Sequence, residues 1–207
     1  MIDAMILITQ YSALSTQHSA LGEWGHPVSG PIDAKMITVF GGSRCGPDEP
    51  EYKEALRLGS LLVEAGFHVC SGGYSGVMEA ISKGAHDADG EVVGMTMTQF
   101  KAAPNKYIKS NVPSRDFYER LQGLILRSVG YVALRGGMGT VTEVSLVWNK
   151  LVTGVLAPRP LILLGECWPR VMACLRAHLV VSDKDMTHIS FVDTAEQAVS
   201  ALTERIV

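Results

Sequence analysis

The amino-acid sequence predicts an α/β fold in which helices cover both faces of a doubly wound, mostly parallel sheet. Short apolar segments typical of strands alternate with longer segments of helical character from residue 36 onward. Glycine-rich turns follow three of the predicted strands, at residues 41–46, 72–76 and 136–139. With 207 residues, 47% of them hydrophobic, the chain can form one substantial core, so we expect a single domain over residues 36–207.

The first half of the alternation begins with an apolar strand and ends with a helix whose apolar residues form a stripe. Arg120 borders this stripe, which includes Phe117, Leu121, Leu124 and Ile125. Before this helix we expect a long irregular connection that runs through Pro113. The predicted elements, in order, are strand 36–40, helix 51–65, strand 67–71, helix 77–88, strand 91–96 and helix 114–128.

The second half continues the same pattern to the C-terminus. Such alternation is typical of βαβ units and of Rossmann-like sheets, which bind ligands at the carboxyl ends of their strands. We therefore expect the three glycine turns to gather at one edge of the sheet. The predicted elements are strand 130–134, helix 140–152, strand 160–164, helix 168–179, strand 189–192 and helix 194–206.

The turn before the helix at 140–152 indicates a ligand most strongly. It reads Arg-Gly-Gly-Met-Gly-Thr over residues 135–140, and Glu143 follows one helical turn later. We expect Thr140 to begin the helix, so that its amide and hydroxyl and the neighbouring N–H groups bind a phosphate. The alternative is an ordinary capping box formed by Thr140 and Glu143. The preceding glycines, which allow a close backbone approach, favour the phosphate site.

The other two glycine turns supply further candidate residues. Ser43 ends the first strand, where a phosphate contact and a simple turn role are equally favoured. Gly72 and Gly73 end the second strand, and we interpret them as glycines that keep backbone space open for a ligand.

Residues 135–143 resemble the Pro-Gly-Gly-x-Gly-Thr-x-x-Glu signature of the LOG family, also labelled lysine decarboxylase-like. Its characterised members are cytokinin-activating phosphoribohydrolases. Segments 39–43, 71–78, 84–87 and 116–121 match in the same order, so the resemblance extends from about Met36 to the C-terminus. It implies that Glu143 and Arg120 are catalytic. The candidate phosphate- and nucleotide-binding residues are Gly136, Gly137, Gly139, Thr140, Gly42, Ser43, Gly72 and Gly73.

Two positions depart from the family pattern. Arg135 stands where the family usually has proline, and Leu121 stands where it usually has lysine. The catalytic pair that the resemblance implies is nevertheless complete.

The expected reaction is hydrolysis of the N-glycosidic bond of a nucleoside 5′-monophosphate, a cytokinin riboside monophosphate or an AMP-like compound, to the free base and ribose 5-phosphate. The resemblance also implies a homodimer or higher homo-oligomer, and the reaction requires no metal or other cofactor. Two alternatives stay open. One is a carrier that binds molybdenum cofactor without converting it, and the other is a non-catalytic nucleotide-binding oligomer. A pyridoxal-dependent decarboxylase is disfavoured because no lysine follows a suitable pattern.

The amino-acid composition indicates which binding partners and which cellular compartment to expect. A formal net charge of −3 gives no reason to expect a nucleic-acid or membrane partner. The four cysteines form no Cys-x-x-Cys pair, so we predict no metal site and expect the reducing cytoplasm. Residues 1–35 lack the basic start of a secretory signal, and we expect them to form an N-terminal extension that is either disordered or packed on a neighbouring subunit.

Overall fold

The computed structural model describes residues 33–206, which form an α/β unit around a seven-stranded sheet. Each neighbouring pair of strands is parallel, in the order β4-β3-β2-β1-β5-β6-β7. The predicted fold class is therefore confirmed. Most of the expected N-terminal extension, 1–35, lies outside the described residues and stays a prediction. The strands are β1 (Met36–Phe40), β2 (His68–Ser71), β3 (Val92–Met97), β4 (Ser110–Ser114), β5 (Gly130–Ala133), β6 (Leu161–Leu164) and β7 (Ile189–Val192).

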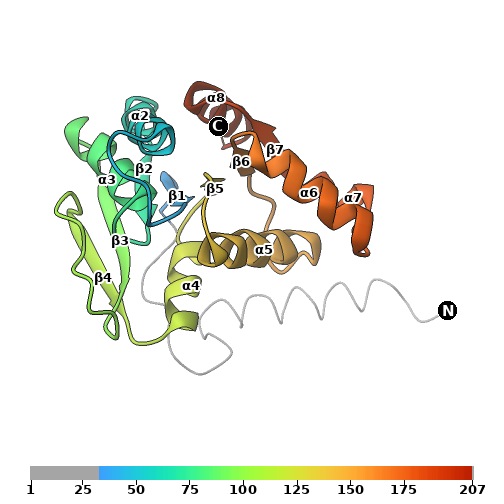
Figure 1. Cartoon of the computed structure of the whole chain (residues 1–207), viewed down its shortest axis with the longest axis horizontal. Helices are drawn as coiled ribbons and strands as arrows, with labels where there is room; N and C mark the ends of the chain where they lie inside the picture. Colours follow the sequence, from blue (N-terminus) through green and yellow to red (C-terminus); the bar gives the residue numbers. More distant parts are fainter. Residues whose placement is uncertain (1–32, 207) are drawn as a thin grey trace. The chain divides into compact units, whose positions relative to one another are not determined.

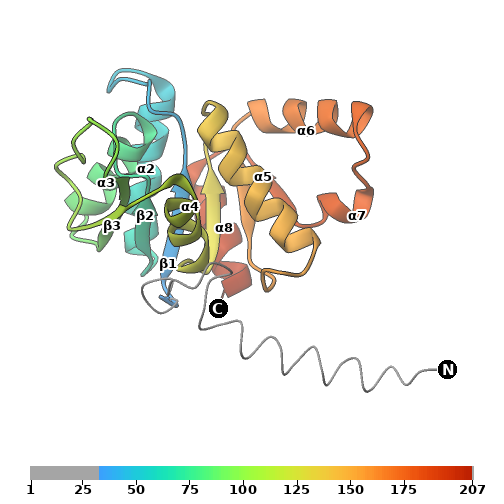
Figure 2. The same cartoon turned by 90° about the horizontal axis from the view of Figure 1, so that it is seen from below.

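The helices lie in two layers, one on each face of the sheet (Figure 1). On one face, α2 (Pro50–Glu64), α3 (Val77–Asp87) and α8 (Ala195–Ile206) contribute to one hydrophobic core. On the other face, α4 (Phe117–Leu126), α5 (Met138–Val152) and α6 (Cys167–His178) contribute to a second. Figure 2 shows α4 in front of β1, with α5 beside α4 on the same side of the sheet. None of the helices within residues 33–206 is long and apolar enough to cross a membrane.

The sheet contains one strand that the sequence did not predict. The expected irregular connection through Pro113 is wrong over its last residues, where β4 pairs with β3 and Pro113 lies opposite Thr96. Proline is tolerated there because β4 is an edge strand, so one side of it needs no ladder hydrogen bonds. The short helix α7 (Asp183–Met186), which begins with a capping box at Ser182, was also not predicted.

The strand order places a ligand-binding edge at β1 and β5. The chain moves outward from β1 to β2, β3 and β4, and then returns to β5 on the other side of β1. Successive connections therefore leave β1 and β5 toward opposite faces and open a crevice at the carboxyl ends of these strands. The two loops that border the crevice touch, because the backbone N–H of Gly42 donates to the carbonyl of Arg135 at 3.1 Å.

Candidate functional site

A pocket with a volume of about 790 Å³ occupies this crevice. Residues from all three glycine turns contribute to its wall, so the expected gathering of the turns at one edge is confirmed. The starts of α2 and α3, the N-terminal parts of α4 and α5, and the connection after β3 also contribute to the wall. Such a volume is within the range that small-molecule sites occupy in proteins.

Arg120 and Glu143 form a buried ion pair at the pocket. Nη1 of Arg120 donates to Oε1 of Glu143 at 3.2 Å, and Nε of Arg120 donates to the carbonyl of Met95 at 2.8 Å. Each residue is 7% exposed. Removal of the Glu143 carboxylate from water raises its pKa to about 7, although the positive charge and the hydrogen bond of Arg120 lower it. At neutral pH, Glu143 can therefore exist in both its protonated and its ionised form.

The N-terminus of α4 determines where Arg120 lies. Asp116 caps the helix, because its Oδ1 accepts the backbone N–H of Glu119 at 2.9 Å. Arg120 follows in the next turn, and its own N–H donates to the carbonyl of Asp116 at 3.2 Å. It is on the buried side of the helix, which packs against β3. The cap thus begins the helix at a point that directs the Arg120 guanidinium toward the sheet edge.

Helix α5 begins earlier than the sequence predicted, and this changes the role of Glu143. The N-cap is Gly137, and it makes no side-chain cap hydrogen bond. Thr140 is therefore the third helical residue, so its prediction as the first residue of the helix is wrong. The alternative capping box is also wrong, because Glu143 lies deeper in the helix and pairs with Arg120. The buried stripe of α5 contains Thr140, Glu143, Val144, Val147 and Leu151.

The first turn of α5 presents backbone N–H groups to the pocket. The first helical hydrogen bond runs from Val141 to the carbonyl of Gly137, so the amides of residues 138–140 have no helical partner. The hydroxyl of Thr140 makes no hydrogen bond within residues 33–206, although Thr140 is only 3% exposed. Added Cβ atoms on Gly137 and Gly139 would meet no atom within 4 Å. Together these groups form an open cradle at a helix N-terminus, which suits an anion.

Gly42 and Gly136 allow the two loops to approach each other closely. A Cβ on Gly136 would lie 2.1 Å from Oγ1 of Thr140, and a Cβ on Gly42 would lie 3.2 Å from Cα of Gly136. Ser43 is exposed at the pocket, and its carbonyl accepts the hydroxyl of Ser75 at 2.9 Å. The structure thus brings together six of the eight predicted phosphate- and nucleotide-binding residues, which are Gly136, Gly137, Gly139, Thr140, Gly42 and Ser43.

Gly72 and Gly73 are not on the pocket wall, so their interpretation as glycines that make room for a ligand does not fit the structure. A Cβ on Gly72 would lie 2.1 Å from Nη2 of Arg120, so the space beside Gly72 holds a side chain of the protein itself. Gly73 has φ of +80°, a conformation that strongly favours glycine, and it packs against Thr96 and Ile108.

Three aromatic side chains give the pocket an apolar side. Tyr74 follows β2 and its ring lies 5.6 Å from that of Phe100, which belongs to the connection after β3. Phe117 at the start of α4 is the third. None of these three aromatic residues is among the site residues predicted from the sequence. Phe100 lies in an irregular segment without periodicity, and Phe117 had been assigned to the apolar stripe of its helix.

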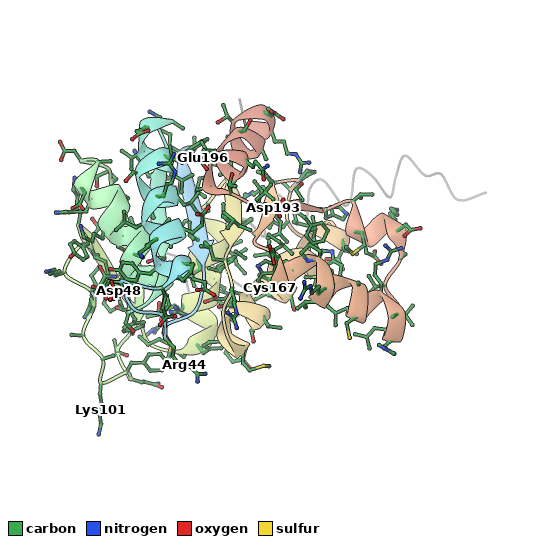
Figure 3. The ribbon with its side chains drawn as sticks, turned by 45° about the horizontal axis from the view of Figure 1, so that its top comes forward. Arg44, Asp48, Lys101, Cys167, Asp193 and Glu196 are labelled. Carbon is green, nitrogen blue, oxygen red and sulfur yellow. The ribbon has the colours of Figure 1, made fainter. Side chains whose placement is uncertain are left out.

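Charged side chains surround the mouth of the pocket. Arg135, which is 72% exposed, pairs with Glu51 at the start of α2, with Nη1 2.8 Å from Oε1. This ion pair lowers the pKa of Glu51. Arg44 is exposed on the loop after β1 (Figure 3). Leu121 stands at the position on α4 where the LOG pattern has lysine, and its side chain is buried. Arg120 therefore has no basic neighbour at this position. Within residues 33–206, no three His, Cys, Asp or Glu side chains are grouped as metal ligands would be.

Comparisons with known proteins agree with the fold and the motifs. A probable cytokinin riboside 5′-monophosphate phosphoribohydrolase of Oryza sativa subsp. japonica is 32% identical over 127 residues, which cover 59% of this chain and 54% of the relative. The pyrimidine/purine nucleotide 5′-monophosphate nucleosidase of Escherichia coli K12 is 30% identical over 141 residues, which cover 63% of this chain and 31% of the relative. This chain therefore matches about half, or less, of the length of these two proteins.

A solved structure shares the fold over most of the chain. The molybdenum cofactor binding protein from Rippkaea orientalis superposes with a TM-score of 0.67 at 21% sequence identity, over 84% of this chain and 98% of that one. The sequence model of the SLOG cluster4 family matches residues 34–195, which include both members of the Arg120–Glu143 pair and the glycine cradle. The chain therefore belongs to the SLOG cluster4 family, and the LOG-family resemblance of its motifs is confirmed.

Proposed function

We propose that this protein hydrolyses the N-glycosidic bond of a nucleoside 5′-monophosphate and releases the free base and ribose 5-phosphate. The observation that carries the proposal is the position of the buried Arg120–Glu143 pair in the same pocket as the open first turn of α5. An acid is thereby placed beside a site that suits a phosphate. Two relatives whose names give activities on nucleoside or nucleotide monophosphates, each at least 30% identical, support the same class of reaction.

The pair suits the charge that develops in this reaction. Cleavage of an N-glycosidic bond passes through an oxocarbenium-like state, so positive charge grows on the ribose while the base takes up electrons. In our proposal the ionised Glu143 stabilises the ribose cation and activates the attacking water. Arg120 orients the carboxylate through its hydrogen bond to Oε1. The low local dielectric around two residues that are each 7% exposed strengthens these effects.

The cradle on α5 would hold the 5′-phosphate. The free amides of residues 138–140 and the hydroxyl of Thr140 supply donors, and the helix dipole favours a negative charge at this end. The aromatic side formed by Tyr74, Phe100 and Phe117 would receive the base. Phosphate binding contributes to the rate as well as to affinity because it converts a small, weakly held ribose into a positioned reactant.

The test is to incubate the purified protein with AMP, GMP, CMP and an N6-isopentenyl form of AMP, and to measure free base by chromatography. We expect base release from at least one of the monophosphates, loss of this release in Glu143→Gln, and much slower release from the matching nucleoside. Turnover of adenosine as fast as AMP would contradict the role assigned to the cradle. The panel also decides between cytokinin precursors and plain nucleotides.

One observation favours a second candidate, a protein that binds its ligand without converting it. Leu121 is apolar and buried. Of the two adjacent positions where the family pattern has basic residues, this chain therefore has a basic residue at Arg120 alone. If this second candidate is correct, neither the wild-type protein nor Glu143→Gln releases free base. A nucleotide or phosphorylated pterin that stays bound through purification, without base release, would favour this carrier function.

We also propose that the protein acts as a homodimer or higher homo-oligomer in the cytoplasm. Exposed apolar side chains gather near the pocket on the N-terminal parts of α4 and α5, and another subunit would shield them from water. They are Phe117, Tyr118, Met138 and Val141. Light scattering on the full chain should give at least twice the mass of one chain; a monomer at micromolar concentration would contradict the proposal.

A further inference from the structure

Gly72 lies directly beside the guanidinium of Arg120. An added Cβ on Gly72 would lie 2.1 Å from Nη2 of Arg120 and 3.3 Å from its Cζ. It would also lie 2.6 Å from Sδ of Met78. No positive φ is involved at this position, since the positive-φ glycines in the described part of the chain are 66, 73, 76, 154 and 165. The need for glycine at residue 72 therefore arises from the neighbouring side chains and not from backbone conformation.

Two hydrogen bonds hold the guanidinium of Arg120. Nε donates to the carbonyl of Met95 at 2.8 Å, and Nη1 donates to Oε1 of Glu143 at 3.2 Å. Because a guanidinium is planar and rigid, a shift at Nη2 must move the other nitrogens with it. Any side chain at residue 72 that displaces Nη2 would thus also change the contact between Nη1 and Glu143.

We propose that Gly72 is a positioning residue: its missing side chain lets the Arg120 guanidinium lie beside the end of β2 and donate to Glu143. The chemical importance of this position rests on the proposed function. The geometric claim, that residue 72 controls the contact between Arg120 and Glu143, does not depend on it.

The first variant is Gly72→Ala. If the added methyl group displaces the guanidinium, Glu143 loses the charge that lowers its pKa, so the pKa of Glu143 should rise above its wild-type value of about 7. The other charged groups on the pocket wall are Arg44, Glu49, Glu51 and Arg135, which lie on the two mouth loops and the start of α2. These groups are unchanged in the variant, so a shift can be assigned to Arg120.

The readout that does not require turnover is the side-chain ¹³C resonance of Glu143 during a pH titration, assigned with Glu143→Gln. In an active enzyme, Gly72→Ala should also lower kcat by about a hundredfold, the cost expected for a misplacement of roughly 1 Å. KM should change little because the phosphate cradle belongs to α5. If the wild-type protein releases no base, the proposed function fails, while the titration still decides the role of Gly72.

The matched control is Gly90→Ala. A Cβ on Gly90 would lie 2.2 Å from Cγ2 of Val63, so the steric conflict is similar, but Gly90 precedes β3 and thus lies at the amino end of the strands. This control should lower the free energy of unfolding and leave the titration of Glu143, kcat and KM unchanged. An equal shift of the Glu143 titration in both variants would overturn the proposal, since it would reflect general loosening.

A double-mutant cycle with Arg120→Lys separates positioning from stability. Lysine has no group at the place of Nη2, so adding Gly72→Ala to Arg120→Lys should cost far less stability than adding it to the wild-type protein. Additive effects would contradict the proposal. If Gly72→Ala does not fold, the cycle is measured in a Met78→Ala background, which removes the second close contact of the added Cβ. In that background, recovery of folding by Arg120→Lys supports the steric relation with Arg120, and failure to recover overturns it.

Discussion

Glu143 occupies a position where the pattern of α5 calls for an apolar residue. It lies on the buried stripe between Thr140 and Val144, and Arg120 is the charged group that offsets the cost of its burial. An unpaired carboxylate at such a site would be expensive to ionise. The pKa of Glu143 therefore depends on where the guanidinium of Arg120 lies.

The pH dependence of base release should follow this coupling. Desolvation raises the pKa of Glu143 and Arg120 lowers it, so in Arg120→Gln the desolvation is less opposed and the pKa should rise further. Since the reaction needs the ionised carboxylate, the acid limb of kcat/KM against pH should move to higher pH than its wild-type position near 7.

Arg135→Gln is the matched control for this experiment, because Arg135 pairs with Glu51 and not with Glu143. Its acid limb should stay in place even if its amplitude changes. A downward shift of the limb in Arg120→Gln would show that the two residues do not interact as the structure indicates.

At the scale of single elements, the beginnings of α4 and α5 determine the geometry of the site. Helix α5 starts at Met138 after a glycine N-cap without a side-chain cap bond, which leaves its first amides open. Helix α4 starts after the Asp116 cap, which satisfies one amide and directs Arg120 inward. The free amides at the start of α5 are thus available to a ligand, whereas the cap at the start of α4 fixes the position of Arg120.

Gly139→Ala should separate helix stability from ligand binding. Residue 139 is the second residue of α5, so alanine should stabilise the helix by up to about 1 kcal/mol, while its methyl group points into open space in the pocket. We expect an unchanged or higher melting temperature and at least tenfold weaker binding of a nucleoside monophosphate by calorimetry. Unaltered binding would remove this turn from the phosphate site.

Gly136→Ala is the contrasting variant. Its Cβ would lie 2.1 Å from Oγ1 of Thr140 and 2.9 Å from the amide nitrogen of Gly42. We therefore expect it to lower both stability and binding, because the loops after β1 and β5 must separate.

Asp116→Ala tests how the cap of α4 supports the site. Loss of the bond from the N–H of Glu119 should cost about 1 kcal/mol of folding free energy and should also lower kcat, because Arg120 lies in the turn that the cap stabilises. Ser182→Ala removes the cap of α7, whose residues are not on the pocket wall, and should lower stability without lowering kcat. Urea unfolding and initial rates of base release measure the two effects; equal kcat for both variants would contradict this role of the cap.

At the scale of the whole molecule, the site costs folding stability. The unfolded chain ionises Glu143 near its ordinary pKa of 4.5, while the folded protein keeps the proton up to about 7. The folded state therefore binds this proton more tightly than the unfolded state does. The contribution of the Glu143 proton to folding stability is fully present below pH 4.5 and is lost as the pH rises through about 7.

The free energy of unfolding should show this loss as a difference between two proteins. Between pH 4 and pH 8, the wild-type protein should lose roughly 3 kcal/mol relative to Glu143→Gln, whose side chain does not titrate. Denaturant unfolding of both proteins across this range measures the difference, and carboxylates elsewhere, such as Glu51 and Glu119, cancel in it. A constant difference would mean that Glu143 keeps its ordinary pKa in the folded state.

Local sequence was sufficient for most elements of the fold. The boundaries of β1 and β7 agree with the prediction, and the large helices differ by a few residues at most, because apolar periodicity and turn glycines act over short stretches of chain. The phosphate cradle was also readable, since Gly136 to Thr140 are contiguous. Arg120 and Glu143 were found through the motif that contains them and not through their spacing, because 23 residues separate them.

Other features depend on contacts that no local pattern encodes. β4 was missed because its pairing with β3 depends on its place at the sheet edge, where Pro113 is tolerated. The cap of α5 was misplaced because the side chain of Glu143 pairs with another helix and not with its own N-terminus. Gly72 makes room for an arginine from α4, a relation that exists only when β2 and α4 are packed together. Periodicity thus defines the strands, helices and turns, whereas the site arises from packing among segments distant in the chain.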